Sequence, residues 1–264
     1  FFATLAAHGI AHPPVRFDVA APGAGGRWLR KDAAGCGGWH IRVADVDERV
    51  APGGSRYFQC EVAGTPMSAT FIANGRGARV VGVNELIVRP RGARPHVFHG
   101  CVGPVSAASS IARRIDEAVQ TLAAAFALRG WCSLDMLVDG AAVQVLEVNP
   151  RPPASLALYA ARGLIDAQLR ACLHAELPAR EVFVPARVAG LEIVFAPRAF
   201  TLGEHAARGL ADRDDVHDVP AAGTRFDAGD PVCSVSAHGA AAAPVHTALS
   251  TARDAVQNLL ETTP

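Results

Sequence analysis

Three polar side chains stand in segments that otherwise resemble buried β-strands: Asp135, Glu147 and Asn149. Asp135 lies in the apolar run Leu134–Leu137, and Glu147 lies in Val145–Val148. An isolated acid is costly in such surroundings unless it is paired or coordinated. Carboxylate and amide oxygens suit Mg²⁺ or Mn²⁺, and the remaining positions of such a site go to water and nucleotide phosphates. We therefore favour a divalent cation site over the alternative of solvated strand residues.

A second group of residues offers what phosphate binding requires. The chain has 25 Lys and Arg residues, and Lys31 is its only lysine. It stands just before a glycine-rich segment that contains Gly35, Gly37 and Gly38. A lysine ammonium is a compact charge that suits phosphate oxygens, and a glycine loop lets backbone N–H groups approach them. The pairing indicates a nucleotide-phosphate site, with a chance lysine at a strand end as the alternative.

A β-hairpin is the element that must position the acids. Trp131–Val138 and Ala142–Asn149 are strand-like and flank Asp139-Gly140, a strong hairpin turn signal. Residues two apart share one face of a strand, so Glu147 and Asn149 point the same way. Folding the hairpin brings Asp135 close to them.

A second hairpin is expected around the glycine loop. Trp28–Lys31 and Trp39–Val43 read as strands on either side of it, which predicts a lid rather than the strand–loop–helix of a P-loop. Arg56–Val62 reads as a strand, and Ser68–Asn74 reads as its partner across Gly64-Thr65-Pro66.

The other expected elements are mainly helices. Apolar residues at steps of three and four predict a helix over Ser106–Arg129, with Ser109 and Ser110 as possible caps. A strand is expected at Arg79–Leu86, and further helices are expected at Ser155–Glu176 and His246–Glu261. A helix end precedes the stop signal His12-Pro13-Pro14.

Composition excludes several classes of protein. The net charge is zero, so there is no electrostatic footprint for nucleic acid. No apolar run approaches the length of a membrane span. The six cysteines are scattered without a CxxC pair, which argues against a zinc site or a disulfide framework and fits a reducing cytoplasm. The chain starts at Phe1 without Met, so we expect a longer protein.

Three side chains offer alternative chemistry that we do not favour: Cys36, His96 and His99. The two histidines are poor candidates for metal ligands, and a wall of the substrate site suits their segment better. Cys36 lies in the glycine loop without an evident His or Asp partner, so a nucleophile is not supported.

Four segments together resemble the ATP-grasp superfamily. Leu146–Pro152 is similar to its E-x-N-P-R motif, Trp28–Gly38 to its lysine and glycine-rich phosphate loop, and Phe58–Gly64 to the hinge whose backbone clasps adenine. Phe1–Pro14 is similar to the segment that leads into the fold. The order is that of the family, and the resemblance implies an α+β ATP-grasp fold in which two α+β subdomains clasp ATP.

The resemblance also implies residue roles. Lys31 holds phosphate oxygens, and the lid over the phosphates is formed by Gly35, Gly37 and Gly38. The adenine slot is lined by Gln59, Cys60, Glu61 and Val62. Mg²⁺ or Mn²⁺ is bound by Asp135, Glu147 and Asn149. Arg151 holds an acyl-phosphate or its carboxylate, which places it with Lys31 among the catalytic residues.

Two hinge positions depart from the family pattern. Gln59 stands where Glu is frequent, and Pro66 stands where a ribose-binding Glu is common. These departures put the nucleotide affinity in question more than the fold.

The expected organisation is an ATP-grasp domain at 1–178, with a lid at about 16–58, and a small β-rich region with a closing helix at 179–264. An α/β domain is expected upstream of Phe1. Asp218–Val235 is similar to the β-rich tail of biotin-carboxylase-related ATP-grasp proteins. Such proteins occur in gene clusters for tetrahydromethanopterin- and methanofuran-linked one-carbon metabolism.

The resemblance implies a cytoplasmic, Mg-dependent ligase that activates a small carboxylic acid with ATP and joins it to an amine. A nucleotide-binding regulatory subunit without catalysis is one alternative, and a biotin-carboxylase-like carboxylation is another. No nucleic acid or membrane partner is expected, and a homodimer stays open.

Overall fold

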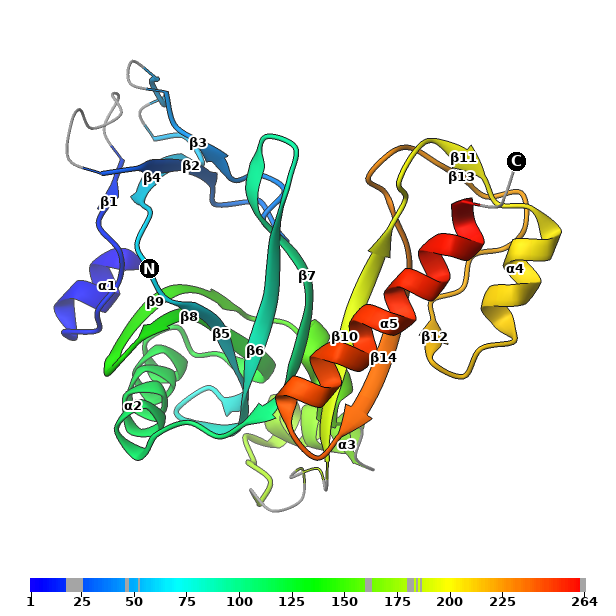
Figure 1. Cartoon of the computed structure of the whole chain (residues 1–264). Coiled ribbons are helices and arrows are strands. Elements are labelled where there is room, and N and C mark those ends of the chain that lie inside the picture. The colour runs from blue at the N-terminus through cyan, green and yellow to red at the C-terminus, as the bar shows by residue number, and fades with distance from the viewer. Residues whose placement is uncertain are drawn as a thin grey trace.

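The computed structural model describes residues 1–17, 26–45, 48–51, 53–159, 163–179, 183, 185 and 187–261. These residues form an α+β structure whose strands belong to sheets of eight, four and two strands. The eight-stranded main sheet has the order β12-β14-β10-β7-β6-β5-β8-β9. Figure 1 shows the four-stranded lid sheet above one part of the main sheet, and the C-terminal elements beside it.

Five long antiparallel strands form one part of the main sheet, with β9 at its edge: β5 (Thr65–Asn74), β6 (Ala78–Arg91), β7 (Arg94–Val105), β8 (Arg129–Asp139) and β9 (Ala142–Asn149). Helix α2 (Ser109–Ala125) packs on this sheet through one apolar stripe: Ile111, Ile115, Val119 and Leu122. On the main sheet a second cluster is built around Trp131 and Tyr159, both almost fully buried. The β8–β9 hairpin is therefore held within a substantial core.

The lid sheet is much smaller. Its strands are β1 (Val15–Arg16), β2 (Trp28–Asp32), β3 (Arg42–Val43) and β4 (Arg56–Cys60), in the order β1-β4-β2-β3. Val50 and Phe58 form its buried core cluster. The strand predicted over Trp39–Val43 is shorter, because residues 39–41 belong to turns of the glycine loop. Part of the predicted lid, residues 18–25, 46–47 and 52, lies outside the described residues.

The pairing predicted for the strand after β4 is wrong. β4 pairs with β1 and β2 in the lid, whereas β5 pairs with β6 and β8 in the main sheet. Gly64 has a φ of +148°, and its Cβ would lie 2.9 Å from the Leu137 side chain. The chain therefore passes from one sheet to the other here, instead of turning back on itself.

The C-terminal region continues the main sheet. β10 (Val188–Phe195) pairs with β7 on one side and with β14 (Pro231–Gly239) on the other. Helices α4 (Glu204–Ala211) and α5 (Ala242–Glu261) cover it with their own apolar cluster. Short strands complete the region: β11 (Phe200–Thr201), β12 (Val216–His217) and β13 (Arg225–Phe226). The closing helix begins four residues earlier than predicted.

Other helices differ from prediction. α1 (Phe2–Ala7) ends before His12 as expected, and α2 is shorter than predicted and has no side-chain cap. The long helix predicted over Ser155–Glu176 is wrong. Its described part contains a 3-10 turn η1 (Ala154–Tyr159), helix α3 (Leu164–Leu169) and a π-turn η2 (Arg170–His174). Gly163, with φ +97°, is the N-cap residue of α3. The predicted linker at 178–185 is only partly described.

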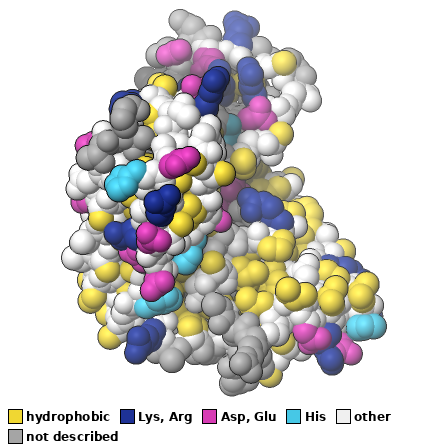
Figure 2. Space-filling view, turned by 90° about the vertical axis from the view of Figure 1, so that its right-hand side faces the viewer, with side chains coloured by type: hydrophobic (Ala, Val, Ile, Leu, Met, Phe, Trp, Pro, Cys, Tyr) yellow, Lys and Arg dark blue, Asp and Glu magenta, His cyan; other side chains and the backbone are white. Residues whose placement is uncertain are grey.

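The segment that contains His96 and His99 lies in strand β7. None of the described helices is both long and apolar enough to cross a membrane. Figure 2 shows positive and negative side chains interspersed over the face that it presents.

Candidate functional site

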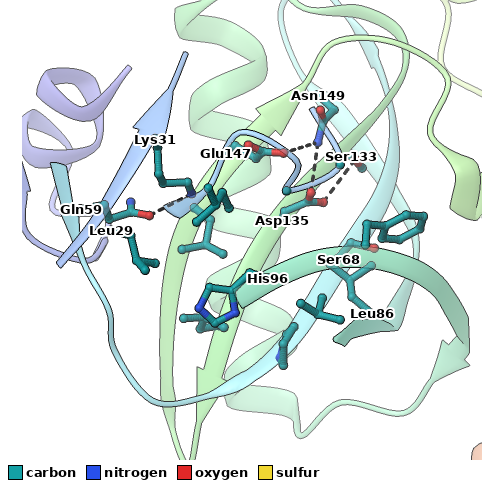
Figure 3. A pocket seen from close by; sticks show the side chains of 18 of the residues that line it. Leu29, Lys31, Gln59, Ser68, Leu86, His96, Ser133, Asp135, Glu147 and Asn149 are labelled. Carbon is teal, nitrogen blue, oxygen red and sulfur yellow. Dashed lines mark hydrogen bonds between the residues drawn. The ribbon is translucent and has the colours of Figure 1, made fainter. Parts of the chain in front are cut away.

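A cavity of about 280 Å³ lies between the lid sheet and the main sheet. Its wall includes the predicted residues Lys31, Gly37, Gly38, Gln59, Cys60, Glu61, Val62, Asp135, Glu147, Asn149 and Arg151. Gly35 is the predicted site residue that does not line it. Figure 3 shows Lys31 and Gln59 on the lid side, and Asp135, Glu147 and Asn149 across the cavity.

The β8–β9 hairpin brings the predicted cation ligands together. Asp135 is directly opposite Glu147 in the antiparallel register, and Ser133 is opposite Asn149. Asn149 Nδ2 donates hydrogen bonds to Asp135 Oδ2 at 3.1 Å and to Glu147 Oε1 at 3.3 Å. Ser133 Oγ lies 3.4 Å from Asp135 Oδ1 as a further donor. The hairpin thus gathers two carboxylates and one amide around a common point, as the turn signal predicts.

The electrostatics of this cluster call for positive charge. Burial and then the neighbouring charge of Glu147 raise the pKa of Asp135 to about 8. Without a cation, the pair therefore resists carrying two negative charges. The donor set, two carboxylates and an amide, fits Mg²⁺ or Mn²⁺, and turning the Asn149 amide would present its oxygen to the same point. Within the described ranges, no group of three His, Cys, Asp or Glu side chains could hold a metal.

Lys31 supplies a buried positive charge on the opposite wall. It lies on β2, its side chain is 5% exposed, and Nζ donates to Gln59 Oε1 at 3.0 Å. Burial lowers the pKa of Lys31, and the charges of Glu147 and Asp135 partly oppose that shift. The Lys31 ammonium therefore interacts electrostatically with the two carboxylates across the cavity, whose wall on β8 and β9 we call the floor.

Gln59 binds the Lys31 side chain, a contact that its position in the hinge did not suggest. Its side chain is 2% exposed and accepts the Lys31 hydrogen bond. Since an amide is neutral, this contact orients the ammonium without cancelling its charge. Gln59 Nε2 is buried and has no hydrogen-bond partner among the described residues, so a donor also faces this region. The departure from Glu at this position leaves the charge of Lys31 available to a ligand.

The glycine loop approaches the main sheet very closely. Gly38 has φ +76°, and a Cβ there would lie 1.7 Å from the carbonyl oxygen of His96. Gly35 is packed for a different reason, because its Cβ would lie 2.1 Å from the His40 ring. Gly37 and Gly38 line the cavity, whereas Gly35 packs against His40. Cys36 is an exposed free thiol.

The hinge is tied to β7 by a contact that sequence reasoning missed. His96 Nε2 lies 2.7 Å from Glu61 Oε1, and Arg27 lies 3.0 Å from Glu61 Oε2. His96, which we expected in a wall of the substrate site, also lines this cavity. His99 is buried, and its Nδ1 lies 3.0 Å from the Val97 carbonyl oxygen. No local signal links Glu61 to His96, because the two residues are 35 positions apart in the sequence.

Arg151 lies beyond the acids, where the chain leaves β9. It is exposed, and its Nη2 lies 3.4 Å from Asn149 Oδ1. Its guanidinium is free of a carboxylate partner within the described residues, which suits an anionic ligand at the cavity wall.

Comparisons with known proteins agree with this arrangement. The family model described as an ATP-grasp domain matches residues 1–155. No curated protein sequence matches the chain.

Solved structures share the fold at low sequence identity. Carboxyaminoimidazole ribonucleotide synthase from Aspergillus clavatus, complexed with ATP, has a TM-score of 0.71 and 13% identity, and the match covers 98% of this chain and 72% of that one. L-amino acid ligase from Bacillus licheniformis has a TM-score of 0.71 and 12% identity, with 97% and 68% covered. Biotin carboxylase from Campylobacter jejuni has a TM-score of 0.67 and 13% identity, with 98% and 69% covered.

The predicted α+β ATP-grasp fold is confirmed by the family match and by these structures. The predicted class, an ATP-dependent ligase, agrees with the ligases among them, and ATP with Mg²⁺ is the cofactor set of the family. Because the family model matches more than half of its length, the chain belongs to the ATP-grasp family.

Proposed function

We propose that this protein is an ATP-dependent ligase that activates a carboxylate as an acyl-phosphate and joins it to an amine. The observation that carries the proposal is the placement of a buried lysine, Lys31, across one cavity from the paired carboxylates Asp135 and Glu147. One wall offers positive charge to phosphate oxygens, and the other offers oxygen ligands to a cation that binds the same phosphates.

Each wall has a defined part in binding the nucleotide. Lys31 binds phosphate oxygens, and the backbone around Gly37 and Gly38 covers them. The hinge residues hold the adenine: Gln59, Cys60, Glu61 and Val62. Mg²⁺ would be held by Asp135, Glu147 and Asn149, and when bound it neutralises phosphate charge. Arg151 binds the carboxylate that is to be activated.

The chemistry needs no covalent enzyme intermediate. A carboxylate oxygen attacks the γ-phosphorus of ATP, the bond to the bridging oxygen breaks, and ADP leaves. The amine nitrogen then attacks the acyl carbon, phosphate leaves, and the amine loses a proton as the amide forms. Lys31, Arg151 and the cation ligands act by positioning the reactants and by stabilising charge.

The carboxylate could also be bicarbonate, which would make the reaction a carboxylation. This second candidate is favoured by the fold shared with carboxyaminoimidazole ribonucleotide synthase and biotin carboxylase. The first step is chemically the same, because bicarbonate takes the place of the organic acid. A regulatory subunit without catalysis is less favoured, since Lys31, Asp135, Glu147 and Asn149 all line the cavity.

The wider organisation belongs to the same proposal. We divide the chain into an ATP-grasp domain at 1–178 and a C-terminal region at 179–264. A cytoplasmic location and a link to one-carbon metabolism stay predictions, as do a homodimer and the absence of nucleic acid or membrane partners.

The test is ATP cleavage by the complete protein with Mg²⁺ and a panel of carboxylic acids and amines. We expect ADP and phosphate only when an acid is present, and a hydroxamate when hydroxylamine replaces the amine. Dependence on bicarbonate alone would select the carboxylation. Tight ATP binding by the complete protein, without cleavage under any pairing of acid and amine, would contradict a ligase and support the regulatory subunit.

A further inference from the structure

Trp39, in the glycine-rich loop, contacts residues from outside the lid. Its ring meets the ring of Phe195, the last residue of β10, edge-on with centroids 5.8 Å apart. The guanidinium of Arg94, on β7, lies over the Trp39 ring at 5.0 Å. Arg94 Nε also donates to the Trp39 carbonyl oxygen at 3.0 Å. Both the ring and the backbone carbonyl of Trp39 thus attach the loop to the main sheet.

Phe195 is held firmly enough to serve as a fixed point. It is 4% exposed, and its ring meets the His99 ring at 4.9 Å. The guanidinium of Arg91 lies 4.5 Å from the centroid of the same ring. Phe195 therefore packs among β6, β7 and the loop, where aromatic and cation–π contacts favour one arrangement.

The same stretch of loop faces the cavity. Phe98 N donates to the Gly37 carbonyl oxygen at 3.0 Å, and Gly38 packs against the His96 carbonyl. Gly37 and Gly38 line the cavity, whereas Trp39 and Phe195 do not. Gly37, Gly38 and Trp39 are consecutive residues. The packing of Trp39 therefore affects where the two glycines lie over the cavity.

We propose that Trp39 and Phe195 form a latch that holds the glycine-rich loop closed over the phosphates of a bound nucleotide. Phe195 is then a positioning residue that the C-terminal region contributes, and it acts through Trp39. The inference rests on the proposed function only in that the loop covers phosphates. Because the adenine slot is built by the hinge, the latch acts on a nucleotide according to how many phosphates it carries.

The test compares two phenylalanines of the same region. Phe195→Leu removes the ring contact with Trp39 and keeps an apolar side chain. Phe200→Leu is the matched control, because Phe200 is also buried, stacks on Phe226 at 5.3 Å and belongs to the apolar cluster of the C-terminal region. Calorimetric titrations of the complete protein with ATP and with AMP, each with Mg²⁺, give the affinities.

We expect Phe195→Leu to weaken ATP binding by about 3- to 10-fold, the range that corresponds to one aromatic pair. AMP binding should not change, and Phe200→Leu should change neither. If Phe195→Leu fails to fold, Trp39→Leu, in the half-buried loop, must show the same ATP-selective loss. When both fold, the double variant should lose no more than the larger single loss.

Two results would overturn the latch: equal ATP affinity in wild type and in the folded variants, or equal losses for ATP and AMP. Both leave nucleotide binding by the wild type intact, so the proposed function survives them. A wild-type protein that binds neither nucleotide would instead overturn the proposed function, and the latch with it.

Discussion

The two walls of the cavity are built in different ways. The floor is a hairpin of strands β8 and β9 within an eight-stranded sheet, and its acids are brought together by strand register. The lid has four strands of two to five residues and a core cluster of Val50 and Phe58. Register fixes side-chain positions within a sheet, but nothing of that kind relates one sheet to another.

The difference shows which contacts matter for each wall. The floor depends on secondary structure that the whole core supports. The lid depends on contacts that cross to the main sheet, at Gly37, Gly38 and Trp39. A segment with a small core can change position without unfolding the main sheet and the helices packed on it, which we call the body. Nucleotide entry beneath a lid requires such a movement.

The floor should lose its chemistry without losing its structure. Glu147→Gln removes one charge with little change in shape, and we expect ATP turnover to fall on the order of 100-fold or more. The thermal midpoint without ligand should hold or rise, because repulsion between Glu147 and Asp135 is relieved. Phosphate release and thermal unfolding measure the two effects.

The matched control for the floor is Asp139→Asn, an exposed carboxyl in the turn of the same hairpin. It should leave both quantities unchanged, since Asn-Gly also suits such a turn. A Glu147→Gln protein that unfolds but keeps its activity per folded molecule would make Glu147 a structural residue.

The charge on the lid should matter next. Lys31→Ala should weaken binding of ATP with Mg²⁺ by about 1–3 kcal/mol, the range of charge-assisted hydrogen bonds. Lys31→Arg should not restore it fully, because a planar fork cannot replace a compact charge held by Gln59. Calorimetry measures all three proteins, and equal affinities would remove Lys31 from the site.

The close approach of the lid to the main sheet can be tested with a pair of glycines. Gly38→Ala would place a Cβ 1.7 Å from the His96 carbonyl oxygen, so the loop must move away from the cavity. We expect ATP affinity to fall by about tenfold, or 1.4 kcal/mol. Gly53→Ala has a similar φ, +72°, but nothing within 4 Å. Its affinity should not change, and equal effects of the two substitutions would show that backbone strain alone is responsible.

The smallest expected effect on ATP binding comes from a substitution that acts only on the stability of the body, at Glu192 on β10. Burial would raise the pKa of Glu192, but hydrogen bonds from Arg89 and Arg253 outweigh burial and hold that pKa below its usual value. Because Arg89 is 39% exposed, we expect Glu192→Gln to lower the free energy of unfolding by only about 1–2 kcal/mol near neutral pH. ATP affinity should hold, which would separate body stability from lid position.

The pH dependence gives this prediction its sign. A lowered pKa contributes stability above the unfolded value of Glu, about 4.3, and that stability is lost as pH falls through the lower folded value. Denaturant unfolding of wild type and Glu192→Gln at several pH values should therefore show the difference narrowing below about pH 4. A difference that stays constant down to the acid limit would contradict the role given to the two arginines.

The features predicted from the sequence are those with local signals. The Asp139-Gly140 turn fixes the hairpin, and alternation then brings Asp135 to Glu147. Lys31 and the glycine loop stand out by composition and spacing, and Lys31, Gly37 and Gly38 line the cavity. Short sequence separation made these inferences possible.

The rest depends on contacts between distant segments. The predicted pairing of β5 with β4 is wrong, because strand propensity does not indicate which sheet a strand joins. The helix predicted over 155–176 is interrupted where Tyr159 packs in the core. The partners Lys31–Gln59, Glu61–His96 and Trp39–Phe195 have no sequence signal, because each pair meets only after folding.

The most direct test of the two-walled site is a crystal structure of the complete protein with Mn²⁺ and a non-hydrolysable ATP analogue. The anomalous signal of manganese locates the cation independently of the nucleotide. We expect that signal between Asp135 and Glu147, with Lys31 Nζ within hydrogen-bond distance of a phosphate oxygen of the same nucleotide. Manganese elsewhere, or phosphates that do not lie between Lys31 and the two carboxylates, would contradict the account.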